Sequence, residues 1–290
     1  MFKMLKRLPG LLALVLPLSL AFAVNAAEPT RFSVEVRGKG PDVILIPGLA
    51  SSRDVWAAMA TQLEGRNRVH LIQVAGFAGV PAAGNADGPV VAPLADEIVA
   101  YIAGRHLDHP AIIGHSMGGF TALLIAGRHP ESVGRVMVVD ALPFFSVLIN
   151  PTATAESMAP QAAGFRDYVM GQSAEAFAAG QTQTMARLVK TPEARAQPLA
   201  WSMASDRSVM ARATYDVMTS DLRGDLAGVK VPVTVIYARD PAMGPGVDQV
   251  YARDYAALPG VRLRPIDGGF HFIMLDQPQV FATEVEAFLK

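Results

Sequence analysis

The chain has 290 residues, 51% of them hydrophobic and 18% charged, which is enough apolar material for a sizeable folded core. With a formal net charge of −1, the chain lacks the excess of basic residues that is typical of nucleic-acid-binding proteins. The chain has no cysteine, which excludes disulfides, thiolate metal sites and cysteine nucleophiles.

The N-terminus is typical of a secretory signal peptide. A cationic head at residues 3–7 precedes an apolar run that ends in small residues. Signal peptides are cut after such residues, here after Ala26 or Ala27, and Pro17 within the apolar run favours cleavage over retention as a membrane anchor. We therefore expect residues 1–26 to be removed, and the mature protein to be periplasmic or secreted, without a stable membrane anchor.

Strand-like and helix-like segments alternate through the first half of the remaining chain. Predicted strands lie at 31–37, 43–46, 68–74, 111–115 and 135–140, and predicted helices at 51–63, 92–104 and 117–128. Most of these strands are apolar on both faces and are separated by helices. This pattern predicts an α/β fold, with a doubly wound, mostly parallel sheet that is covered on both sides.

The alternation stops between residues 141 and 225, where helical stretches rich in Ala, Met and Phe contain no convincing strand. It resumes with strands at 231–238 and 261–266 and helices near 247–257 and 277–289. The sequence therefore predicts a core built from residues 27–140 and 226–290. A helical insertion at 141–225 is expected to lie above its sheet.

The stretch G-H-S-M-G (114–118) follows a predicted strand and precedes a predicted helix. Glycines on both sides of Ser116 remove Cβ atoms that would clash in a sharp turn. The pattern matches the G-x-S-x-G nucleophile elbow, and the start of the next helix directs backbone N–H groups toward the serine. Ser116 is the predicted nucleophile.

A serine hydroxyl needs a base to take its proton, and His271 is the predicted base. It lies in D-G-G-F-H-F (267–272), a loop between the last strand and the last helix that can reach back over the sheet. His115 adjoins the serine, but neighbouring residues at a turn point in different directions, so we interpret it as buried scaffold. The other four histidines are interpreted as structural or solvated.

A third group must hold the tautomer of the histidine and stabilise its cation. Asp240, in Y-A-R-D-P (237–241), follows the penultimate strand beside the histidine loop, and Asp140 ends the preceding strand. We favour Asp240, which completes the order Ser116, Asp240, His271 expected for this fold, and keep Asp140 as the alternative.

Two backbone N–H groups are predicted to hold the oxyanion. Met117 follows the nucleophile directly. Pro47-Gly48 turns the chain after the second strand, so the N–H of Leu49 is expected to face the serine.

Four short motifs resemble those of the α/β-hydrolase superfamily, and the likeness extends over nearly all of residues 31–290. They are P-G-L (47–49), G-H-S-M-G-G (114–119), the R-D pair at 239–240 and G-F-H-F (269–272). The chain resembles a serine-nucleophile, lid-bearing member of this superfamily. The resemblance implies that the insertion at 141–225 covers Ser116 as a lid.

The chain departs from the superfamily pattern in two places. Many relatives have His-Gly where this chain has Pro47-Gly48, so a polar side chain is lost there. Many also carry an Asp-x-x-Gly-x-Gly-x-Ser run after the next strand, whereas Q-V-A-G-F-A-G-V-P (73–81) lacks that aspartate. Phe77 is therefore expected to enter the substrate pocket.

The resemblance and the apolar insertion together predict a carboxylesterase-like enzyme with a Ser-His-Asp triad. It would cleave small to medium apolar carboxylic esters through an acyl-enzyme, without a cofactor or a metal. Phe144 and Trp201 of the insertion are expected to line the pocket with Phe77, because Met-rich and aromatic surfaces suit apolar ligands. The expected partner is a small apolar molecule and not nucleic acid, and the oligomeric state is left open.

Other activities fit the same triad and remain alternatives. Within the superfamily these are lactonase, thioesterase, amidase, carbon–carbon hydrolase and perhydrolase activity, and lipase activity at membrane interfaces. From another class, a non-catalytic hydrolase-like ligand-binding protein is the alternative. Fold analogy does not decide among them.

Overall fold

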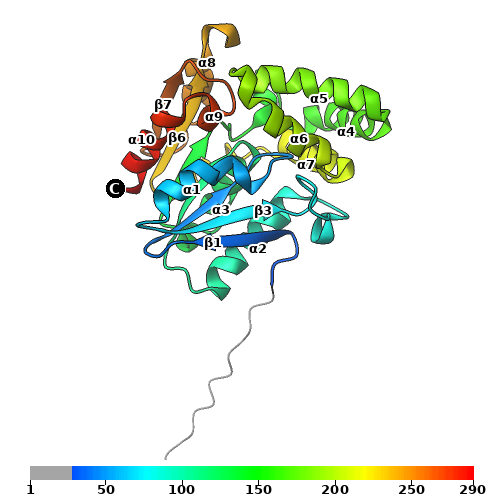
Figure 1. Cartoon of the computed structure of the whole chain (residues 1–290). Helices are drawn as coiled ribbons and strands as arrows, with labels where there is room; N and C mark the ends of the chain where they lie inside the picture. Colours follow the sequence, from blue (N-terminus) through cyan, green and yellow to red (C-terminus); the bar gives the residue numbers. More distant parts are fainter. Residues whose placement is uncertain (1–27) are drawn as a thin grey trace, which may run out of the picture.

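The computed structural model describes residues 28–290 (Figure 1), so the predicted signal peptide lies outside the described residues. Its centre is a seven-stranded sheet in the order β1-β3-β2-β4-β5-β6-β7. The strands are β1 (Phe32–Arg37), β2 (Asp42–Ile46), β3 (Arg68–Val74), β4 (Ala111–His115), β5 (Arg135–Val139), β6 (Val233–Arg239) and β7 (Arg262–Asp267). Only the edge strand β1 is antiparallel to its neighbour, so the predicted mostly parallel sheet is confirmed.

Helices cover both faces of this sheet, because alternate side chains of each central strand point to opposite sides. Ile112 of β4 packs in a core with Leu94, and Ile113 packs in a separate core with Trp56. The first core holds α2 (Val91–Gly104), α3 (Met117–Arg128) and α8 (Val247–Asp254). The second holds α1 (Ala57–Leu63), α9 (Ile273–Asp276) and α10 (Pro278–Leu289). The fold is thus doubly wound.

Four α-helices follow one another between β5 and β6, where the sequence predicts the insertion. They are α4 (Ala155–Gly171), α5 (Ala174–Leu188), α6 (Ala196–Ala204) and α7 (Arg207–Thr219), and we call them the inserted helices. Side chains of Thr154, Ser173 and Asp206 accept backbone N–H groups at the starts of α4, α5 and α7, which stabilises these ends. Figure 1 shows the inserted helices, in green and yellow, grouped together beside the sheet.

Hydrogen bonds join the inserted helices to two loops at the carboxyl edge of the sheet. The N–H of Asp206 donates to the carbonyl of Gly76 at 2.7 Å, in the loop after β3. The N–H of Phe272 donates to the carbonyl of Leu188 at 3.1 Å, in the loop after β7. The inserted helices therefore lie at the edge where polar groups of parallel strands gather. Among residues 28–290, no helix has the length and apolarity to cross a bilayer.

Candidate active site

Ser116 occupies a sharp turn between β4 and α3. Its backbone has φ 54° and ψ −121°, a conformation that non-glycine residues rarely adopt. Its N–H donates to the carbonyl of Val139 at 2.9 Å, and its own carbonyl accepts the N–H of Phe120 at 2.9 Å. The neighbouring strand β5 and the first turn of α3 therefore hold the strained residue in place. Such a turn presents the serine hydroxyl away from its own scaffold.

The glycines around Ser116 allow close approach between backbones. A Cβ atom on Gly114 would collide with the carbonyl oxygen of Gly118. A Cβ atom on Gly118 would collide with the carbonyl oxygen of Ile46 and lie 2.6 Å from that of Pro47. The positive φ falls on Ser116 itself, whereas the glycines let α3 begin directly against β4 and the end of β2.

His271 is paired with Asp140. Its Nδ1 lies 2.6 Å from Oδ2 of Asp140, and the two side chains are 22% and 9% exposed. Oδ1 of the same carboxylate accepts the N–H of Ala238 at 2.9 Å and the hydroxyl of Tyr251 at 3.2 Å. Because a carboxylate only accepts, Nδ1 of His271 carries the proton, and Nε2 of the neutral ring is left with the lone pair that a general base needs.

The preference for Asp240 as the partner of His271 is wrong, and the alternative, Asp140, makes the contact. Oδ2 of Asp240 accepts from Lys190 Nζ at 2.6 Å, and Oδ1 accepts the N–H of Ala242 at 2.9 Å, in a turn of 3-10 helix over Pro241–Met243. These hydrogen bonds, that from Lys190 foremost, hold the pKa of Asp240 below its usual range. Both oxygens are thus engaged by groups other than the histidine.

His115 is fully buried and supports the loop of His271. Its Nε2 lies 3.0 Å from the carbonyl oxygen of His271, and the two ring centroids are 4.6 Å apart. Burial, reinforced by the nearby His271, holds the pKa of His115 well below its usual range. His115 is therefore a neutral ring that donates from Nε2 to that carbonyl. The sequence predicted the burial of His115 but not this contact with the histidine loop.

The predicted oxyanion donors lie on two turns that are in close contact. A Cβ atom on Gly48 would lie 3.1 Å from Cβ of Ser116 and 2.9 Å from Nδ1 of His115. Leu49 follows Gly48 directly, so its backbone lies next to the elbow. Met117 is the first residue of α3, where an N–H has no intrahelical partner. The role of the Leu49 and Met117 N–H groups as oxyanion donors stays a prediction.

The three predicted pocket residues are buried in the described structure. Phe77 and Phe144 are fully buried, and Trp201, on α6, is 9% exposed. The guanidinium of Arg223 lies 4.9 Å from the ring centroid of Phe144. Contact of these three side chains with a substrate stays a prediction.

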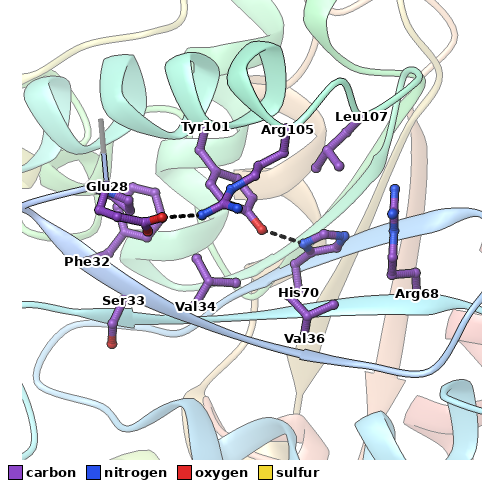
Figure 2. Close-up of a pocket in the computed structure, with 11 residues that line it drawn as sticks. Glu28, Phe32, Ser33, Val34, Val36, Arg68, His70, Tyr101, Arg105 and Leu107 are labelled. Carbon is purple, nitrogen blue, oxygen red and sulfur yellow. Dashed lines mark hydrogen bonds and ion pairs between the residues drawn. The ribbon is translucent and has the colours of Figure 1, made fainter. Parts of the chain in front are cut away.

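A surface cavity of about 420 Å³ lies over the edge strand β1, whose residues Phe32, Ser33, Val34 and Val36 line it (Figure 2). His70 of β3 and Tyr101 of α2 also line it. Nδ1 of His70 lies 2.7 Å from the Tyr101 hydroxyl, and Nε2 lies 2.8 Å from Asp42. The charged side chains that line this cavity form ion pairs, Arg68 with Asp42 and Arg105 with Glu28.

A second cavity, of about 620 Å³, borders Lys190, Asp240 and Gly268. Neither cavity is lined by Ser116 or His271. Among residues 28–290, no group of three or more His, Asp or Glu side chains is placed to hold a metal ion.

Comparison with known proteins identifies the family of the chain. A family model described as the alpha/beta hydrolase fold matches residues 41–278. The pimeloyl-[acyl-carrier protein] methyl ester esterase of Aeromonas hydrophila is 26% identical over 260 residues, which cover 89% of this chain and 98% of that protein. The protein of the same name from Chromobacterium violaceum is 35% identical over 113 residues, which cover 39% of this chain and 41% of that protein.

Solved structures share the fold over most of the chain. An esterase from Exiguobacterium antarcticum has a TM-score of 0.76 at 17% identity and covers 91% of this chain and 97% of its own. The enol-lactonase from Burkholderia xenovorans LB400 has a TM-score of 0.73 at 20% identity and covers 90% of this chain and 96% of its own. Since the family model spans most of the chain, the chain belongs to the α/β-hydrolase family.

Proposed function

We propose that the protein is a serine hydrolase that cleaves small to medium apolar carboxylic esters through an acyl-enzyme. The observation that supports this most directly is the Asp140–His271 pair at the edge of the sheet that also holds the strained Ser116 elbow. His115, adjacent to Ser116, packs against the ring of His271. Nucleophile, base and acid are therefore carried by loops in mutual contact.

The proposed mechanism assigns one step to each group. His271 Nε2 takes the proton of Ser116 as Oγ attacks the ester carbonyl carbon, and Asp140 stabilises the imidazolium. The N–H groups of Leu49 and Met117 hold the oxyanion of the tetrahedral intermediate. When the intermediate collapses, the C–O bond to the alcohol breaks and the alcohol takes the proton from His271. In the second half, His271 takes a proton from water as the water oxygen attacks the acyl carbon. The bond to Ser116 Oγ then breaks, Oγ takes the proton back from His271, and the acid is released.

The ester class is supported by the names of the relatives and by the character of the insertion. Relatives that match along most of this chain are named pimeloyl-[acyl-carrier protein] methyl ester esterases, names that describe the cleavage of a methyl ester. The inserted helices contribute Met, Phe and Trp side chains next to the carboxyl edge of the sheet. We propose that they form a lid over Ser116 and favour uncharged apolar acyl groups.

A specific observation favours a second function, lipase activity at an interface. Large hydrophobic residues exposed in the described structure concentrate in and just before the inserted helices. They include Phe145, Leu148, Ile149, Phe165, Tyr168, Met170 and Met203. Exposed apolar surface of this kind suits contact with lipid aggregates. A rate that rises sharply above the critical aggregation concentration of the substrate would favour this function over ordinary ester hydrolysis.

The test is hydrolysis of p-nitrophenyl esters, from acetate to long acyl chains, by the wild type and by Ser116→Ala. Turnover with a defined chain-length optimum is expected from the wild type. Loss of the nucleophile is expected to lower kcat by about a millionfold. Equal activity of the two proteins would exclude Ser116 as the nucleophile. If both are inert, thioesters, amides, lactones, diketones and ligand binding without turnover become the alternatives to test.

We also propose that the enzyme is exported and acts in the periplasm or outside the cell. This rests on the cationic head and apolar run of residues 1–26.

A further inference from the structure

Asp140 has a second side-chain partner, the phenol of Tyr251 on α8. While Oδ2 faces His271, Oδ1 accepts the Tyr251 hydroxyl at 3.2 Å and the backbone N–H of Ala238 at 2.9 Å. Asp140 itself has φ 49° in the loop after β5. The donors to Oδ1 come from α8 and β6, so elements remote in sequence set the rotation of this carboxylate.

The ring of Tyr251 stacks with the rings of two other tyrosines. Its centroid lies 4.1 Å from that of Tyr237, with 13° between the planes, and 6.2 Å from that of Tyr255, with 5° between the planes. The side chain is buried. The stacking holds the ring whose hydroxyl donates to Asp140.

The Tyr251 hydroxyl remains a donor over the whole working range of a hydrolase. Burial, together with the charge of Asp140, raises the pKa of Tyr251 well above its usual value. A phenol that keeps its proton is neutral, donates to the carboxylate and adds no charge beside the Asp140–His271 pair. Removing the hydroxyl would leave Oδ1 with one backbone donor and allow the carboxylate to turn.

We propose that Tyr251 is a positioning residue of the triad, whose hydroxyl holds Asp140 so that Oδ2 stays aligned with Nδ1 of His271. This inference rests on the proposed Ser116–His271–Asp140 site. Through Asp140 it would control the orientation of the imidazole, and with it the rate of proton transfer from Ser116. Tyr251 does not itself touch the reacting atoms.

The fold offers matched controls for the test. Tyr255→Phe removes a buried hydroxyl from the same stack, one that donates to the carbonyl of Ala141 at 2.7 Å. Tyr237→Phe removes a hydroxyl that donates to Asp248 at 2.7 Å. Each variant keeps its ring, so the stacking is preserved in all three. Only Tyr251→Phe removes a donor to Asp140.

The experiment measures kcat and KM for a p-nitrophenyl ester over a range of pH. It also follows the titration of the His271 imidazole by NMR without substrate. Tyr251→Phe is expected to lower kcat by about 10- to 100-fold, as loss of outer partners of functional groups does, with little change in KM. The pH profile and the NMR titration of His271 are expected to differ from those of the wild type, because the carboxylate that faces Nδ1 is no longer held by the phenol. Both controls are expected to keep the wild-type midpoint.

An unchanged midpoint and kcat in Tyr251→Phe would overturn the proposal, as would equal changes in Tyr255→Phe. Urea unfolding of each variant separates these effects from loss of fold. Because the NMR titration needs no turnover, it tests the Tyr251–Asp140–His271 contact even if no ester is cleaved. A Ser116-dependent esterase with a normal Tyr251→Phe variant would refute this inference alone.

Discussion

Nδ1 of His271 lies 2.6 Å from Oδ2 of Asp140, at the end of β5, although β6 with Asp240 lies between β5 and β7 in the sheet. The loop after β7 therefore carries the histidine past the neighbouring strand. Two hydrogen bonds hold this loop in place. The N–H of Phe272 donates to the carbonyl of Leu188, and Nε2 of His115 donates to the carbonyl of His271. Asp240 is left to pair with Lys190 of the insertion.

This arrangement predicts opposite results for two equivalent substitutions. Asp140→Asn is expected to lower kcat by about 10⁴-fold, because an amide in place of the carboxylate can favour the wrong histidine tautomer. Asp240→Asn is expected to retain most of the wild-type kcat, since its carboxylate bonds to Lys190 and Ala242. The measurement is kcat on the best p-nitrophenyl ester. The reverse ranking would restore Asp240 as the triad acid.

Asp276 ties the histidine loop to the insertion. Its carboxylate accepts the backbone N–H groups of Lys190 at 3.0 Å, Thr191 at 2.9 Å and Phe270 at 2.9 Å. Asp276→Ala leaves these donors without their acceptor and is expected to lower the free energy of unfolding by about 1–3 kcal/mol. It is also expected to lower kcat, because Phe270 adjoins His271.

Urea unfolding and steady-state kinetics check this prediction. The matched variant is Asp276→Asn, which keeps one accepting oxygen and is expected to fall between the wild type and Asp276→Ala in both measurements. Wild-type stability and kcat in Asp276→Ala would show that the hydrogen bonds accepted by Asp276 are dispensable.

Two glycine substitutions are expected to change stability in opposite directions. In Gly118→Ala the new Cβ meets the backbone of Ile46 and Pro47, so the elbow must shift, at a cost of about 1–3 kcal/mol and most of the activity. In Gly164→Ala, within α4, the Cβ meets no atom within 4 Å. That variant is expected to gain about 0.5–1 kcal/mol from the lower entropy of alanine in the unfolded chain. Urea midpoints measure both changes.

Buried His115 makes stability depend on pH. Because burial holds its pKa well below the usual value, the unfolded chain binds a proton below about pH 6.5 that the folded chain does not. The stability that depends on the protonation of His115 is therefore at its full value above that pH. It is expected to fall, by at most about 1.4 kcal/mol per pH unit for this residue, as the pH drops toward the folded pKa.

The check is urea unfolding at several pH values between about 7.5 and 5.5. His115→Asn removes one titrating group and is expected to reduce the slope, while buried His70, whose pKa burial also lowers, keeps part of it. His106→Asn, at an exposed position, is expected to leave the slope unchanged. Equal slopes in the wild type and His115→Asn would contradict the assignment of this effect to His115.

Export predicts a defined mature N-terminus. If the signal peptide is cut as the sequence predicts, the mature chain begins at Ala27 or Glu28. Mass spectrometry of the protein from periplasmic and culture fractions measures this directly. An intact Met1 in the membrane fraction would instead indicate a retained anchor.

The local sequence determined the strands, the elbow and the helical insertion, because each has a short-range signal. Apolar runs predict the strands, glycines around Ser116 predict the sharp turn, and helical periodicity without strands predicts the insertion. The histidine loop was predictable for the same reason, since His271 stands alone between the last strand and the last helix.

Only the tertiary structure decided which aspartate meets His271. Asp140 and Asp240 both stand at the carboxyl ends of adjacent parallel strands, so their local signals are equivalent. The choice depends on the path of the loop after β7 and on Lys190, 50 residues before Asp240, which occupies its carboxylate. The contact of Tyr251 with Asp140 spans 111 residues and was likewise not predicted. Such pairings are set by how helices and loops pack over the sheet, which no single segment of the sequence encodes.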